Sequence, residues 1–175
     1  MTPMDDAGAQ VRAAVPGFLL ATLTVLMGFA LGGLFGLNED AIKTRLEARA
    51  AAVEATVYKG DASAATAVLA KSWTYMQRAH LHAGATGTAA VALIGMLVLV
   101  GAAPRSIRIT GLLLGLGALG YSLFWLWAGF RAPSLGGTGA AKESLRWLAM
   151  PSAGAILLGT LCAMLLTARA MVKRG

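Results

Sequence analysis

The chain contains two histidines, and they are the side chains best suited to chemistry. His80 and His82 lie in the run A-H-L-H-A-G, where a polar stretch passes directly into an apolar one. Residues two apart on a helix point about 200° from one another, so the two imidazoles are expected to face opposite sides. An imidazole can bind a metal, move a proton or form a hydrogen bond near neutral pH. We therefore treat the two histidines as separate candidates.

The neighbours of each histidine predict which one faces the protein. His80 shares a helical face with Gly84 and Gly87, and small residues mark helix contacts in membranes. His82 lies one turn from Arg78, whose charge favours water or lipid headgroups, so this face is expected to point outward. We predict that His80, rather than His82, is the main contact if a cofactor binds. The alternative is an interfacial histidine whose only role is a hydrogen bond.

The same run resembles the histidine-x-histidine helix of haem-copper oxidase subunit I, over a short stretch that includes the glycines after His82. In that family each histidine ligates a different haem, on opposite faces of the helix. If haem b binds, we expect His80 to be its metal ligand. The chain has no third histidine, so a copper centre and a bis-histidine haem within one chain are excluded. A second axial ligand would be a methionine, for which Met150 is best placed, or a partner's histidine, or would be absent.

The four tryptophans are all expected at one end of the molecule, the end that also holds both histidines. One interpretation is an aromatic belt that anchors a single membrane interface. The other is a pocket for haem or a quinone, and its candidate cofactor-binding residues are His80, His82, Met150, Trp73 and Trp147. No catalytic residue is predicted, because no predicted span contains a carboxylate and neither an H-E-x-x-H motif nor a Ser-His-Asp arrangement is found.

The composition identifies an integral membrane protein. The chain of 175 residues is 57% hydrophobic and only 13% charged, about half the charged fraction of an average soluble domain. Its mean hydropathy is +0.68. The formal net charge is +7, but the basic residues flank apolar runs, as topology signals and lipid-headgroup contacts do. No nucleic acid is therefore expected as a partner, and the single cysteine, Cys162, excludes a disulfide within the chain.

Four apolar runs are long enough to cross a bilayer. Residues 16–37 carry no charge, and at 1.5 Å per residue they extend roughly 33 Å. We predict an all-α, four-helix membrane bundle whose first two spans continue outward as a helical hairpin that stands outside the membrane. The predicted segments are a flexible N-terminal tail (1–15), four spans (16–37, 80–101, 110–130 and 148–170), the extramembrane hairpin (38–79), a loop with a short surface helix (131–147) and a basic tail (171–175).

The hairpin prediction depends on two amphipathic stretches joined by a turn signal. Apolar residues follow a helical period in 42–57 and again in 65–76, so the two stripes can pack on each other. Between them, Gly60 is expected to end one helix and Asp61 to cap the next. Asn38 either caps a new helix or lies within a first helix that simply continues outward.

Glycine spacing predicts where helices approach one another. Gly28, Gly32 and Gly36 recur every four residues and share one helical face. Such a face lets another helix approach closely, either within the same bundle or in a dimer. The predicted helix-packing glycines are Gly28, Gly32, Gly36, Gly84, Gly87, Gly111 and Gly115.

Four spans place both termini on the same side of the membrane. The basic loop after the second span and the basic C-terminus predict that this side is cytoplasmic, with the hairpin outside, in a cell (inner) membrane. We expect a subunit, or an assembly or scaffold protein, that docks a partner through the hairpin and is not catalytic on its own. The alternative is a redox accessory subunit that holds haem or a quinone near His80. The expected partners are the lipid bilayer and either other membrane protein subunits or further copies of this chain in a homo-oligomer.

Overall fold

The computed structural model describes the backbone of residues 3–172 and the side chains of residues 7–172, and within these ranges every regular element is helical. Four helices are long and apolar enough to cross a membrane, so the chain is an all-α, multi-pass membrane protein, as predicted. In chain order the elements are α1 (Pro3–Ala51), the π-helical turn η1 (Glu54–Tyr58), α2 (Ala62–Leu99), α3 (Pro104–Arg131), the 3-10 turn η2 (Pro133–Leu135), α4 (Thr138–Ser144) and α5 (Arg146–Val172).

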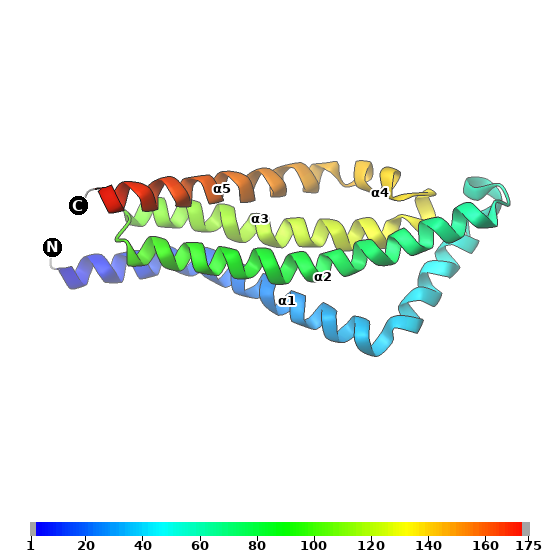
Figure 1. The fold of residues 1–175 in the computed structure, drawn as a ribbon, viewed down its shortest axis with the longest axis horizontal. Coiled ribbons are helices and arrows are strands. Elements are labelled where there is room, and N and C mark those ends of the chain that lie inside the picture. Colours follow the sequence, from blue (N-terminus) through cyan, green and yellow to red (C-terminus); the bar gives the residue numbers. More distant parts are fainter. Residues whose placement is uncertain (1–2, 173–175) are drawn as a thin grey trace.

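Helix α2 lies at the centre of the bundle. Helices α1 and α3 pack along it and also contact each other, whereas α5 packs mainly along α3. Both chain ends lie at one end of the molecule, called the terminal end below, and the hairpin tip lies at the other, the hairpin end (Figure 1). Near the terminal end the apolar core includes Ile94, Leu97 and Ile107, which are all fully buried. The antiparallel packing of α2 against α1 and α3 therefore fixes the positions of the candidate functional residues.

The prediction of a flexible tail is wrong for the residues that the structure describes, because α1 already begins at Pro3. Proline is well tolerated at the start of a helix. Ala14 is only 7% exposed and packs in the core near the terminal end. Part of this segment is therefore buried, although its composition is polar. Residues 1–2, and 173–175 of the predicted basic tail, lie outside the described residues.

Helix α1 bends at Asn38, where its apolar part ends. This residue has non-helical angles of φ −131° and ψ 25°, and its side-chain amide donates to Leu34 O at 3.4 Å. A side chain that inserts into the helical hydrogen-bond ladder is a recognised cause of kinks. The first helix thus continues outward but changes direction sharply (Figure 1). Helix α2 instead runs unbroken from the hairpin into the bundle, which confirms that part of the prediction.

The predicted turn at the hairpin tip is confirmed. Lys59 and Gly60 both adopt left-handed backbone angles, with φ of 54° and 79°, and glycine does so at no steric cost. The Asp61 carboxylate accepts a hydrogen bond from Ala64 N at 2.9 Å and caps α2. The π-helical turn η1 was not predicted; it ends at Tyr58, whose side chain is buried.

The hairpin contacts the bundle, which the prediction of a hairpin outside the membrane did not address. The Tyr58 hydroxyl donates to Pro133 O at 2.7 Å, and the Arg49 guanidinium lies 4.2 Å from the centroid of the Phe130 ring. The predicted short helix is α4, and it is not confined to the surface, because Ala141 is fully buried. These contacts bury apolar side chains that a free hairpin would expose. The hairpin is consequently held against the bundle by these contacts.

Replacing Tyr58 with phenylalanine is expected to destabilise the hairpin tip by about 1 kcal/mol, because a buried hydrogen bond is lost. Burial raises the pKa of the Tyr58 phenol above its ordinary value of 10.0. The contribution of a group with a raised folded-state pKa is complete below the unfolded value and is lost as pH rises through the folded value. A spin label at Ser63→Cys, in a Cys162→Ala background, should therefore become more mobile above pH 10.0. The same alkaline transition in Tyr58→Phe would contradict this assignment.

Candidate functional site

His80 faces α1, as predicted. Its Nδ1 lies 2.8 Å from Gly28 O, and because a carbonyl oxygen only accepts, Nδ1 must carry the proton. Gly32 makes room for the ring, since a Cβ atom added there would lie 2.7 Å from His80 Cε1. Two turns of α1 thus hold one imidazole in a single orientation. The remaining ring nitrogen is Nε2, which in a neutral imidazole of this tautomer is an acceptor.

His80 lines a hollow in the seam between α1 and α2. Among the described residues nothing hydrogen-bonds Nε2, and this atom is not among the buried unpartnered polar atoms. The hollow has a volume of about 330 Å³. It is lined by Gly32, Phe35, Gln77, His80 and Leu81. Leu81 is 63% exposed, so the hollow opens sideways from the bundle.

His82 does not point outward, so that prediction is wrong. Its ring stacks on Trp125 of α3, with centroids 5.5 Å apart and planes at 29°, and meets Tyr121 edge-on at 5.0 Å. The charged Arg78 side chain lies against aromatic rings of the protein and does not turn this face toward water. Its guanidinium lies over the rings of Tyr75 and Trp125, at 5.3 Å and 5.2 Å from their centroids. A cation held by aromatic faces can stay close to the protein surface.

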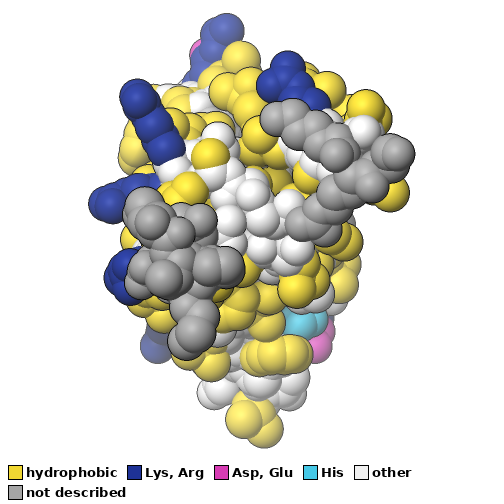
Figure 2. Space-filling model, turned by 90° about the vertical axis from the view of Figure 1, so that its left-hand side faces the viewer, with side chains coloured by type: hydrophobic (Ala, Val, Ile, Leu, Met, Phe, Trp, Pro, Cys, Tyr) yellow, Lys and Arg dark blue, Asp and Glu magenta, His cyan; other side chains and the backbone are white. Residues whose placement is uncertain are grey.

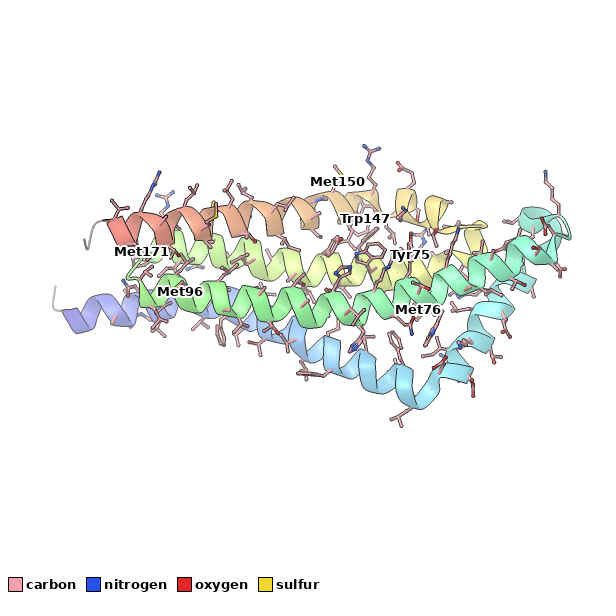
Figure 3. The ribbon with its side chains drawn as sticks, viewed as in Figure 1. Tyr75, Met76, Met96, Trp147, Met150 and Met171 are labelled. Carbon is pink, nitrogen blue, oxygen red and sulfur yellow. The ribbon has the colours of Figure 1, made fainter. Side chains whose placement is uncertain are left out.

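The five predicted cofactor residues do not converge on one site. Trp73 lies on the α1 side with His80, where its ring meets Phe35 edge-on at 5.4 Å. Trp147 and Met150 are 65% and 63% exposed on α5. Helix α5 lies across the bundle from α1 (Figure 3), so Met150 is not an axial partner for His80 in the same chain. The sequence placed Met150 at the same end of the bundle as His80 but could not show which helices separate the two.

The predicted glycines contribute unequally to helix packing. Added Cβ atoms at Gly28, Gly87 and Gly115 would lie 2.9, 2.8 and 2.7 Å from atoms of a neighbouring helix. Gly111 has only ordinary contacts, the nearest at 3.6 Å. Gly36 does not pack as predicted: an added Cβ there would meet no described heavy atom within 4 Å.

Two further glycines complete this account. An added Cβ at Gly84 would also meet no described atom within 4 Å, although its backbone nitrogen lies against Gly28. Gly17 was not among the predicted packing glycines, yet a Cβ there would lie 2.4 Å from the Gly111 backbone. Gly17 stands apart from the four-residue glycine series, so periodicity could not find it. Close helix approach is therefore a local property of single glycines in this bundle.

The hairpin carries an open hollow between its two arms, which the sequence analysis did not predict. Its volume is about 580 Å³. A smaller hollow of about 220 Å³ continues it toward the tip and shares Glu47, Thr66 and Leu69 with it. We call the two together the hairpin groove, whose main part is lined by Lys43, Leu46, Glu47, Thr66, Leu69, Ala70 and Trp73.

The hairpin groove has an apolar floor and a charged rim. Leu46 is 1% exposed, whereas Lys43 is ion-paired with Glu39 at the rim and lies 5.4 Å from the Trp73 ring centroid. Helix α1 diverges from α2 along its apolar part, and the bend at Asn38 turns it back toward α2, so the two arms of the hairpin converge toward the tip (Figure 1). A periodic sequence pattern does not reveal such a bend.

No cluster of three or more His, Cys, Asp or Glu side chains able to hold a metal ion occurs among the described residues. Comparison with protein-family models, with curated proteins and with solved structures found no match for this chain. The features of this chain that bear on function are therefore the hairpin groove and the surroundings of His80.

Proposed function

We propose that the chain is a non-catalytic membrane subunit, or an assembly or scaffold protein, that docks a partner in the hairpin groove. The observation that carries this proposal is that the hairpin is held against the bundle and contains an open groove with an apolar floor. The contacts of Tyr58 and Arg49 hold the hairpin in place before a partner binds. A preorganised surface loses less conformational entropy when a partner binds. The partner is another membrane protein subunit or a second copy of this chain.

A charged substitution in the groove should dissociate the native assembly. Ala70 lines the hairpin groove and is exposed, so Ala70→Arg places a charge over the apolar floor without burying it in the protein. Ala48→Arg is the matched control, because Ala48 is exposed on α1 but does not line the groove. In mild detergent, native mass spectrometry should show a larger assembly for the parent and for Ala48→Arg. Assemblies of equal mass for all three proteins would contradict the proposal.

A second function has its own support, namely a redox accessory subunit that holds haem b or a quinone at His80. Donation from Nδ1 to a backbone carbonyl orients many metal-binding histidines and leaves Nε2 for the ligand. Bound haem would supply one-electron chemistry. The chain's own contribution would be to orient His80 through Gly28 and to make room through Gly32. The second axial ligand would come from a partner, since Met150 lies across the bundle.

The absorption spectrum of the purified native assembly distinguishes these two functions. A docking subunit shows no Soret band of its own, whereas a haem subunit shows one that depends on His80. We expect His80→Ala, rather than His82→Ala, to reduce bound pigment or quinol turnover of the parent complex, because His80 lines a hollow. Loss of signal in His82→Ala with a normal signal in His80→Ala would contradict a site at His80.

We further propose that the protein lies in a cell (inner) membrane with its termini in the cytoplasm. In the view onto the terminal end, Lys and Arg side chains lie along the top and left edges (Figure 2), and basic residues favour a cytoplasmic surface. A cysteine at Ser63, in a Cys162→Ala background, should react with an impermeant reagent in intact cells, because Ser63 is exposed on the hairpin. Reaction only after the cells are broken open would reverse the topology.

A further inference from the structure

A second groove lies at the terminal end, in the seam between α1 and α2. Its volume is about 500 Å³, and every residue that lines it is apolar. We call it the terminal groove. Helix α1 contributes Val11, Val15 and Phe18, among others, and α2 contributes Gly95, Val98 and Leu99. A wholly apolar lining offers no group that could bind a polar ligand.

The walls of the terminal groove are exposed within helices that cross the membrane. Val11, Phe18 and Leu99 are 54%, 42% and 77% exposed in the isolated chain. Gly95 leaves a notch between them, because an added Cβ there would meet no described heavy atom within 4 Å. Exposed apolar surface at this depth is covered by hydrocarbon rather than by water. The concave shape distinguishes this surface from the convex helix faces that ordinary bulk lipid covers.

Two arginines lie close in the chain to residues that line this groove. Arg12 directly follows the lining residue Val11, and its guanidinium extends back over Gly8, toward the helix start. Such an extension brings the charge to the headgroup region while the stem stays in the apolar layer. Arg105 begins α3 just beyond the end of α2. Neither arginine takes part in a salt bridge with any residue whose side chain the structure describes.

We infer that the terminal groove binds one acyl chain of an anionic phospholipid, from the leaflet on the side of the termini. The apolar lining accepts the chain, the notch at Gly95 takes part of its width, and Arg12 meets the phosphate. Anionic headgroups are attracted to juxtamembrane arginines, which favours an anionic lipid over a zwitterionic one. This site is independent of the hairpin groove, which lies at the opposite end of the molecule.

Native mass spectrometry of the full chain, exchanged into phosphatidylglycerol or phosphatidylcholine, tests this inference. The parent should retain a stoichiometric phosphatidylglycerol after delipidation. Gly95→Phe fills the notch and should reduce retention several-fold. Gly154→Phe on α5 is the matched control and should retain the lipid, because Gly154 also has open space around it and does not line the groove. If Gly95→Phe fails to fold, Gly95→Leu makes the same test with a smaller side chain.

A third variant tests the headgroup contact. Arg12→Gln should keep a bound lipid but lose the preference for phosphatidylglycerol over phosphatidylcholine. Equal retention by Gly95→Phe and Gly154→Phe would overturn the site. An unchanged preference in Arg12→Gln would overturn the anionic lipid as its occupant. If Gly95→Phe changes the number of chains in the particle but not the lipid retained, a second copy covers the groove and the inference is wrong.

Discussion

Gly17→Leu is expected to be the most damaging single substitution in the bundle, with a loss of roughly 3 kcal/mol or more in the free energy of unfolding. A Cβ atom added at Gly17 would lie 2.4 Å from the backbone carbon of Gly111 and 2.5 Å from its oxygen. Backbone atoms cannot rotate away, so α1 and α3 would have to separate. Because α1 also packs on α2, the separation would disturb both seams. Reversible unfolding in mixed detergent measures the loss.

Gly36→Leu is the matched control for this prediction. Gly36 lies on the same helix, but an added Cβ there would meet no described heavy atom within 4 Å. The leucine side chain should be accommodated without moving a helix, and the unfolding curve should match that of the parent. A comparable loss in Gly17→Leu and Gly36→Leu would show that the α1–α3 crossing is not the cause.

Gly32→Leu is expected to have the second largest effect, about 2 kcal/mol, from overpacking and a lost hydrogen bond together. Its Cβ would displace the His80 ring, now 2.7 Å away at Cε1, and break the 2.8 Å contact between Nδ1 and Gly28 O. The imidazole is the mobile end of a side chain and can swing aside. This is why we expect a smaller loss than at Gly17, where the obstacle is backbone.

A double-mutant cycle isolates that contact. In a His80→Ala background the ring is absent, so Gly32→Leu should cost clearly less than in the parent. Residues in direct contact commonly show coupling of about 0.5–3 kcal/mol in such cycles. Strictly additive losses would mean that Gly32 does not shape the surroundings of His80.

The features that could be predicted from the sequence are those set by local chemistry. An N-cap carboxylate accepts a hydrogen bond from the backbone N–H three residues later, and this interaction needs no other part of the protein. Asp61 therefore caps α2 as expected. Long uncharged runs must be helical in lipid, since each backbone polar group must be satisfied within its own segment. The continuity of α2 follows from the same rule, because no proline or glycine interrupts its polar half.

The predictions that failed required knowledge of which helix covers which face. Helical periodicity states that His80 and His82 point in opposite directions, but not that α2 has a neighbour on each side. His82 consequently packs on Trp125, and Met150 lies beyond α3 rather than near His80. A pattern of apolar residues does not contain the bend at Asn38, where the side-chain amide donates to Leu34 O. It therefore could not show how the two arms of the hairpin converge beyond that bend (Figure 1).

Photo-crosslinking in intact membranes tests most directly whether the hairpin groove seats a partner. A photoreactive side chain at Thr66 would sit in the groove wall, whereas one at Thr44 would sit on an exposed position of the other arm that lines neither part of the groove. The docking proposal predicts a single adduct of defined mass from Thr66 that Ala70→Arg abolishes, and no such adduct from Thr44. The absence of an adduct from Thr66, or the same adducts from both positions, would contradict it.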